Sequence, residues 1–130
     1  MPIPLIHKIH RSDTGSFQEL ARESEGFVLK QLSLLTVSPG CTRGGHYHTR
    51  KKEWFCPISG RGTIRLVDID SLREVIIKID SFYNKEFYYI PPNIAHWVSN
   101  PHQLSDLVIL ILISEEYDEE DPDTFRFEEM

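Results

Sequence analysis

The sequence predicts one all-β domain, a single jelly-roll β-barrel that spans residues 1–130. A chain of 130 residues is long enough for one continuous core and too short for two ordinary domains. Short stretches rich in β-branched and aromatic residues recur between clusters of Gly, Pro, Asn and Asp. No long stretch has the period of an amphipathic helix. Many short strands with few helices are typical of an antiparallel sandwich or barrel, and the jelly roll is the common form at this size.

The expected strands cover residues 28–37, 53–58, 62–69, 75–79, 87–90 and 107–114. The segments 38–40, 59–62 and 91–93 carry the Gly, Pro and Asn residues that chain reversals need, and residues 68–72 are expected to form a hairpin tip. The apolar run 107–113 is much shorter than a membrane-spanning helix and is rich in β-branched residues. We therefore expect a buried strand there and no membrane association.

Composition and charge exclude several classes of protein. The chain is 40% hydrophobic and 26% charged, as in an ordinary globular protein, and its net charge is -6. Residues 115–130 are dense in carboxylates, with Arg126 as the single basic residue, and residues 115–123 are expected to form a solvated terminal segment. The rest is close to neutral and lacks the basic surface that nucleic acid requires. Residues 1–10 do not resemble a secretory leader, so a cytoplasmic protein with free thiols at Cys41 and Cys56 is expected.

Two histidines and a glutamate form the clearest chemical pattern. His46 and His48 are two residues apart, so in a strand they share one face, and a turn returns Glu53 beside them. His96 follows a proline turn and provides a fourth donor. Three imidazoles and a carboxylate suit zinc, iron, manganese, nickel or copper better than calcium or magnesium. The alternative is a set of polar residues that line a barrel mouth without metal.

The spacing of these residues resembles the first cupin motif, Gly-x5-His-x-His-x4-Glu-x6-Gly, in full. It is met by Gly40, His46, His48, Glu53 and Gly60. The second cupin motif is met at Pro91, His96 and Asn100, while Lys85 and Asn93 stand where that motif has glycines.

Within the cupins, the sequence resembles the sugar-nucleotide branch. Residues 13–19 (Asp-Thr-Gly-Ser-Phe-Gln-Glu) are similar to the Asp-Arg-Gly-x-Phe-x-Glu opening of deoxysugar epimerases and ketoisomerases, although Thr14 replaces the arginine. Residues 42–48 and 121–125 resemble the C-terminal cupin domain of the bifunctional capsular-polysaccharide enzymes of UDP-N-acetyl-L-fucosamine synthesis. The likeness covers nearly the whole chain.

This resemblance implies an isomerase that epimerises the carbon next to the ketone of a nucleotide-linked 4-keto-hexose for cell-surface polysaccharide. It also implies one divalent metal, for which zinc is the first choice and iron, manganese or nickel are alternatives. A homodimer and a separate reductase in the same pathway are implied as well. The substrate-binding residues would be Arg43, Phe17 and Glu19.

If the four motif side chains bind metal, proton transfer falls to another residue, and Tyr47, Tyr88 and Tyr89 are the visible candidates. Arg43 could meet a diphosphate or form a structural ion pair, whereas Lys51 and Lys52 are expected to be solvated.

Three other functions stay open. One is a metal-free 3,4-ketoisomerase in which His46 and His48 move protons themselves. Four residues separate His48 from Glu53, whereas ketoisomerases of the thymidine-nucleotide class typically have three residues there. This difference in spacing favours the metal-dependent interpretation. Another is a non-catalytic module that binds a sugar or metal. A dioxygenase with iron on the same four side chains ranks last, because it leaves residues 13–19 and Arg43 without a purpose.

Overall fold

The computed structural model describes residues 9–102 and 104–129. Residues 1–8, on which the expectation about a secretory leader mainly depends, lie outside that part. Apart from the three-residue 3-10 helix η1 (Glu23–Glu25), the elements are strands. No helix in the described part is long and apolar enough to cross a membrane.

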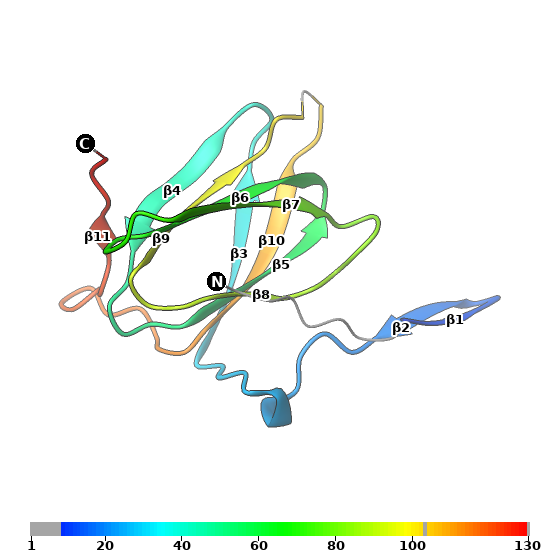
Figure 1. Cartoon of the computed structure of the whole chain (residues 1–130). Coiled ribbons are helices and arrows are strands. Elements are labelled where there is room, and N and C mark those ends of the chain that lie inside the picture. Colours follow the sequence, from blue (N-terminus) through cyan, green and yellow to red (C-terminus); the bar gives the residue numbers. More distant parts are fainter. Residues whose placement is uncertain (1–8, 103, 130) are drawn as a thin grey trace.

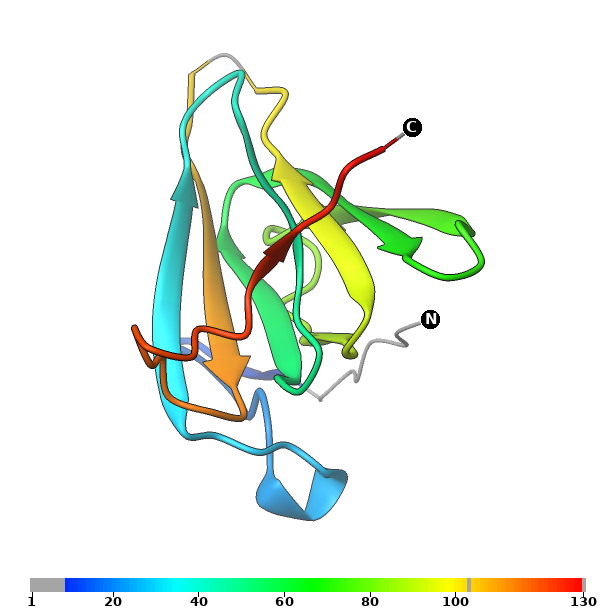
Figure 2. The ribbon, with the colours of Figure 1, turned by 90° about the vertical axis from the view of Figure 1, so that its left-hand side faces the viewer.

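Two antiparallel sheets face each other and confirm the expected jelly-roll class (Figure 1, Figure 2). The first sheet has the order β3 (Gln31–Val37), β10 (Leu107–Ile113), β5 (Glu53–Ser59) and β8 (Tyr88–Ile90). The second has the order β11 (Phe125–Arg126), β4 (Thr42–Tyr47), β9 (Ile94–Ser99), β6 (Arg61–Asp68) and β7 (Glu74–Asp80). The two are hydrogen-bonded as separate sheets, so the body is a sandwich and not a closed barrel.

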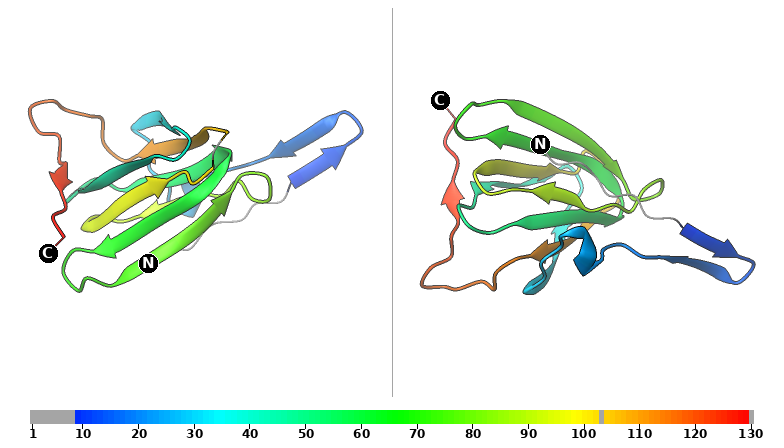
Figure 3. Two further views of the ribbon diagram at one scale, coloured as in Figure 1. Left: turned by 90° about the horizontal axis from the view of Figure 1, so that it is seen from above. Right: turned by 60° about the horizontal axis from the view of Figure 1, so that its bottom comes forward.

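A third, two-stranded sheet lies apart from this body. It is the hairpin of β1 (Ile9–Ser12) and β2 (Gly15–Gln18), which projects away from the sandwich (Figure 1, Figure 3).

The core fills the space between the two large sheets because inward-facing residues alternate along their strands. Its members include Val37, Phe55 and Ile109 from the first sheet and Ile64 and Leu66 from the second. Burial of each such side chain contributes about 1.5–3 kcal/mol. This core holds β5 and β9, and pairing with β9 sets the register of β4.

The expected strands agree with the structure to within one residue at each end, except at the start of β3, and several strands were not expected. β3 begins at Gln31 rather than at residue 28, whereas the 68–72 hairpin tip is confirmed as the turn between β6 and β7. There the Asp68 carboxylate accepts hydrogen bonds from the backbone N–H groups of Asp70 and Ser71. β4, β9, β11 and the β1–β2 hairpin were not in the expected set.

Candidate functional site

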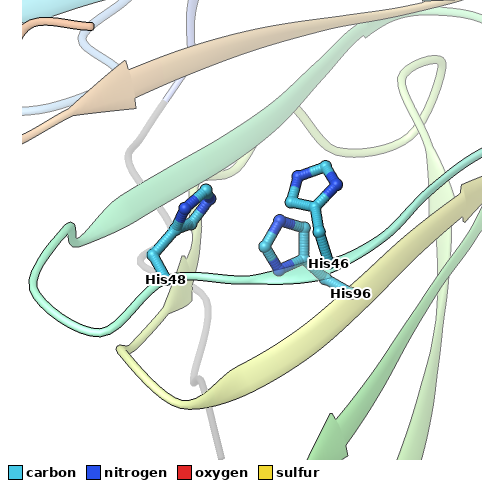
Figure 4. A group of neighbouring side chains, drawn as sticks. All are labelled: His46, His48 and His96. Carbon is cyan, nitrogen blue, oxygen red and sulfur yellow. The ribbon is translucent and has the colours of Figure 1, made fainter. Parts of the chain in front are cut away.

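Three histidines converge between the sheets (Figure 4). His46 is on β4, His48 directly follows that strand, and His96 is on β9. One ring nitrogen from each lies within 4.8 Å of the others. The rings of His46 and His96 are 4.8 Å apart between centroids, and that of His48 is 5.3 Å from His46.

A bulge between β4 and β9 sets this arrangement. The strands pair through Gly44 opposite Trp97 and His46 opposite His96, and the register shifts between those two pairs. Gly44 has φ +113°, and a Cβ at this position would lie 2.5 Å from the carbonyl oxygen of His96. Only glycine allows the two strands to approach this closely here.

Glu53, the first residue of β5, adds a buried carboxylate to the three rings. Its Oε1 lies 2.9 Å from Nε2 of His48 and 3.4 Å from Nε2 of His96. Although these three atoms are close together, none has a partner in hydrogen-bond geometry among the residues that the structure describes. Buried polar atoms without partners are costly, and here they all face one point.

The other ring nitrogens of two histidines are fixed by backbone carbonyls. Nδ1 of His48 lies 2.7 Å from the carbonyl oxygen of Asp123, and Nδ1 of His96 lies 3.1 Å from that of Ile94. A neutral ring that donates from Nδ1 presents an unprotonated Nε2. In their neutral form, both rings would therefore offer an Nε2 lone pair to the point that Glu53 also faces, as metal-binding histidines do.

The electrostatics of the cluster follow from burial and from one negative charge. Burial, together with His96 and His48, lowers the pKa of His46 to about 4, and burial also lowers the pKa of His96. Burial alone would lower the pKa of His48 as well, but the close contact with the negative charge of Glu53, together with the backbone carbonyl of Asp123, outweighs it and raises that pKa. The histidines in turn lower the pKa of Glu53, against the effect of its burial.

This donor set fits a divalent transition metal. Three imidazole nitrogens and one carboxylate oxygen match zinc, iron, manganese or nickel, and a single carboxylate offers too few oxygens for calcium. His46 is partly exposed and would lie on the open side of such a site, whereas His48, Glu53 and His96 are buried.

The three tyrosines named from the sequence lie in different places. Tyr47 stacks on Phe125, and its position between His46 and His48 turns it to the opposite face of β4. Tyr89 stacks on Trp54 in a second apolar cluster, on the outer face of the first sheet. Only Tyr88 shares the interior core with Phe55, whose ring contacts that of His96 at 5.6 Å.

The residues expected to bind substrate are not gathered at the histidines. Arg43 is an exposed residue of β4, three positions before His46. Phe17 is 63% exposed and belongs to the β1–β2 hairpin, which projects from the sandwich (Figure 3). Glu19, just after the hairpin, accepts hydrogen bonds from Arg22.

Two expectations about surface residues are wrong. Lys51 is buried, with its Nζ 5.5 Å from the centre of the Tyr117 ring, because its backbone N–H is drawn in by Asp123. Asp123 itself is only 2% exposed, although it lies in the acidic segment expected to be solvated. Most of that segment is exposed, as is Lys52. No local signal distinguishes Asp123 from its acidic neighbours, since its partners are more than 70 positions away.

Comparisons with known proteins place the whole sandwich in context. Residues 10–125 match the family model described as "Polysaccharide biosynthesis C-terminal domain". A curated relative is the "UDP-2-acetamido-2,6-beta-L-arabino-hexul-4-ose reductase" of Pseudomonas aeruginosa, 31% identical over 118 residues, which are 90% of this chain and 30% of that protein.

Two solved structures have a similar fold. The capsular polysaccharide assembling protein CapF from Staphylococcus aureus is 27% identical with a TM-score of 0.72, and the match covers 94% of this chain and 34% of that one. QdtA, a sugar 3,4-ketoisomerase from Thermoanaerobacterium thermosaccharolyticum solved with TDP, is 25% identical with a TM-score of 0.78, over 96% of this chain and 87% of that one. The chain thus spans about a third of the reductase and of CapF, and most of QdtA.

Proposed function

The chain belongs to the polysaccharide biosynthesis C-terminal domain family, and on that premise we propose that it is a sugar-nucleotide isomerase. It would epimerise the carbon next to the ketone of a nucleotide-linked 4-keto-hexose with the help of one divalent metal, zinc foremost. The observation that carries this proposal is the cluster of buried, partnerless atoms that His48, Glu53 and His96 direct at one point beside His46. The likeness to QdtA and CapF supports the class of substrate.

Epimerisation beside a ketone requires removal of a carbon-bound proton, and this becomes feasible when the negative charge that develops on oxygen meets a prearranged positive field. A divalent ion held by His46, His48, Glu53 and His96 would supply that field as a Lewis acid. The protein contributes the fixed donor set and the apolar surroundings, which exclude water and strengthen every charge interaction inside.

Proton transfer then needs a further group, and position favours Tyr88 over Tyr47 and Tyr89. Its side chain belongs to the interior cluster that also holds Phe55, whose ring contacts that of His96. Burial, with Glu86 beside it, raises the pKa of Tyr88 to about 12. The phenol is therefore protonated at neutral pH and suited to return a proton to carbon, while a separate base would accept the proton that leaves the carbon.

One alternative has an observation in its favour. A 3,4-ketoisomerase without metal would use His46 and His48 as base and acid, and the chain matches most of the length of QdtA. The lowered pKa of His46, about 4, leaves that ring neutral at pH 7, as a base must be. His48, with its raised pKa and its contact with Glu53, would then be the better proton donor.

We also propose two partners. A reductase would consume the ketone that an epimerase leaves in place, in keeping with the name of the curated relative. A second copy of the chain would cover the outer face of the first sheet, where Leu32 is 56% and Leu34 is 66% exposed. A cytoplasmic location would fit a nucleotide-linked substrate.

The test is solvent exchange during turnover. The protein would be incubated in D2O with UDP- and dTDP-linked 4-keto-6-deoxyhexoses, and the products followed by NMR. Epimerisation predicts deuterium at the carbon next to an unmoved ketone, whereas ketoisomerisation predicts a ketone moved to carbon 3. His46→Gln and His96→Gln should abolish exchange, and the control His102→Gln, outside the cluster, should retain it. Saturable binding of these sugars without any exchange would instead identify a non-catalytic module.

A further inference from the structure

The turn that follows β4 is held by a single carboxylate from the opposite end of the chain. Oδ1 of Asp123 accepts hydrogen bonds from the backbone N–H of Thr49 at 2.9 Å and from its hydroxyl at 2.5 Å. Oδ2 accepts from the N–H groups of Arg50 at 2.8 Å and Lys51 at 3.0 Å. These contacts to a charged acceptor are stronger than neutral ones, so they fix the backbone between His48 and β5.

The main chain of the same residue holds the ring of His48. Its carbonyl oxygen lies 2.7 Å from Nδ1, while Nε2, on the far side of the ring, lies 2.9 Å from Glu53. Asp123 has φ +49°, a left-handed conformation that aspartate and asparagine adopt more readily than most residues. This conformation lets the side chain and the carbonyl of one residue address the turn and the ring together.

Further contacts keep the segment around Asp123 against the site. β11 pairs with β4 through Phe125 opposite Tyr47 and Arg126 opposite His46. Phe127 donates its N–H to the carbonyl of Gly45 at 2.9 Å. The strand that carries His46 and the turn after His48 are therefore both bound by one C-terminal segment, residues 123–127.

We propose that Asp123 is a positioning residue for the site: by clamping the turn and the Nδ1 edge of His48, it aims Nε2 at the point shared with Glu53 and His96. The proposal rests on the proposed function in so far as a metal occupies that point. A carboxylate that merely capped the turn would stabilise the fold but would not control the tautomer or direction of the ring. The two roles make different predictions.

The experiment combines zinc affinity with NMR of the metal-free protein. Asp123→Asn keeps the left-handed backbone but places an amide against N–H donors. Its matched control is Asp121→Asn. This substitution also removes one negative charge, but from an exposed side chain two residues earlier in the chain. Thr49→Val, which removes only the hydroxyl contact, serves as a milder second variant if Asp123→Asn folds poorly.

In the metal-free wild type, 15N-labelled His48 should have its proton on Nδ1, protected from exchange, and Asp121→Asn should preserve this signal. Asp123→Asn should shift or broaden it, and Thr49→Val should do so to a smaller extent. Zinc affinity, measured by chelator competition, should fall about 10- to 100-fold in Asp123→Asn. In a His48→Ala background, Asp123→Asn should change the zinc affinity by less than about threefold, because positioning acts through that ring.

Unchanged His48 signals and zinc affinity in a folded but less stable Asp123→Asn variant would overturn the proposal and leave a turn cap. An equal loss of affinity with and without His48 would overturn it too. A wild type that binds no zinc, but whose His48 signal depends on Asp123, would contradict the metal in the proposed function and still support the positioning role.

Discussion

Substitution of Gly44 by alanine tests the close approach of β4 and β9 that places His46 opposite His96. A Cβ there would lie 2.5 Å from the carbonyl oxygen of His96 and 3.0 Å from Cα of Trp97, and both are backbone atoms that no rotamer change can move. The φ of +113° adds strain for any residue with a side chain. Strain of about 2 kcal/mol and overpacking of a similar size give a loss of about 4 kcal/mol.

Gly40→Ala is the matched control, because Gly40 also has a positive φ, +73°, but a Cβ there would meet no atom of the described residues within 4 Å. It should cost only about 1 kcal/mol. For a chain of this size each kcal/mol lowers Tm by about 3–5 °C. Thermal unfolding followed by circular dichroism should therefore show a fall of roughly 12–20 °C for Gly44→Ala and about 4 °C for the control. Equal stabilities for the two variants would refute the described approach of the strands.

Three further predictions follow from buried or exposed side chains. Asn100→Ala should lower the free energy of unfolding by about 3 kcal/mol in urea titrations, because the Nδ2 of this buried side chain donates to the carbonyls of Val37 and Ser105; a loss under about 1 kcal/mol would contradict this. Because the pKa of Tyr88 is raised to about 12 in the folded protein from about 10 when unfolded, its contribution to stability is present below pH 10 and is lost as pH rises toward 12. Unfolding measured between pH 9 and 11.5 should show that loss in the wild type and a shallower one in Tyr88→Phe, and identical slopes would argue against a buried phenol. Leu34→Glu, at a 66% exposed position, should leave the fold intact but shift a dimer toward monomer in light scattering, whereas an unchanged mass would exclude this face as the interface.

The strands that the sequence predicts are those whose own side chains are β-branched or aromatic. β10 is a continuous run of leucine, isoleucine and valine, and such a run is recognisable as a strand without knowledge of its partner strands. β4 is not recognisable in this way, because its residues, Thr-Arg-Gly-Gly-His-Tyr, have low strand propensity. They are held extended by β9 on one side and β11 on the other. Strand formation there depends on pairing with residues far away in sequence.

Although the sequence did not predict β4 as a strand, it predicted that the histidines on and beside this strand lie together. His46, His48 and His96 lie together in the structure, as their spacing led us to expect, while metal binding by them stays a prediction. Asp123 and the burial of Lys51 could not be predicted, because they arise from a contact across more than 70 residues. Periodicity and motif spacing describe local geometry only. The contacts of Asp123 with the turn after β4 depend instead on where the C-terminal segment packs in the folded structure.

The central claim is that His46, His48, Glu53 and His96 bind one divalent metal, and elemental analysis tests it most directly. Protein purified without chelators, and then offered zinc, iron and manganese, would be analysed alongside His46→Ala, His48→Ala and His96→Ala, with His102→Ala as the control outside the cluster. We predict about one metal ion per wild-type and control chain and its loss in each of the three variants. A wild-type protein that stays metal-free under these conditions would contradict the ligand assignment and leave His46 and His48 as the groups that move protons.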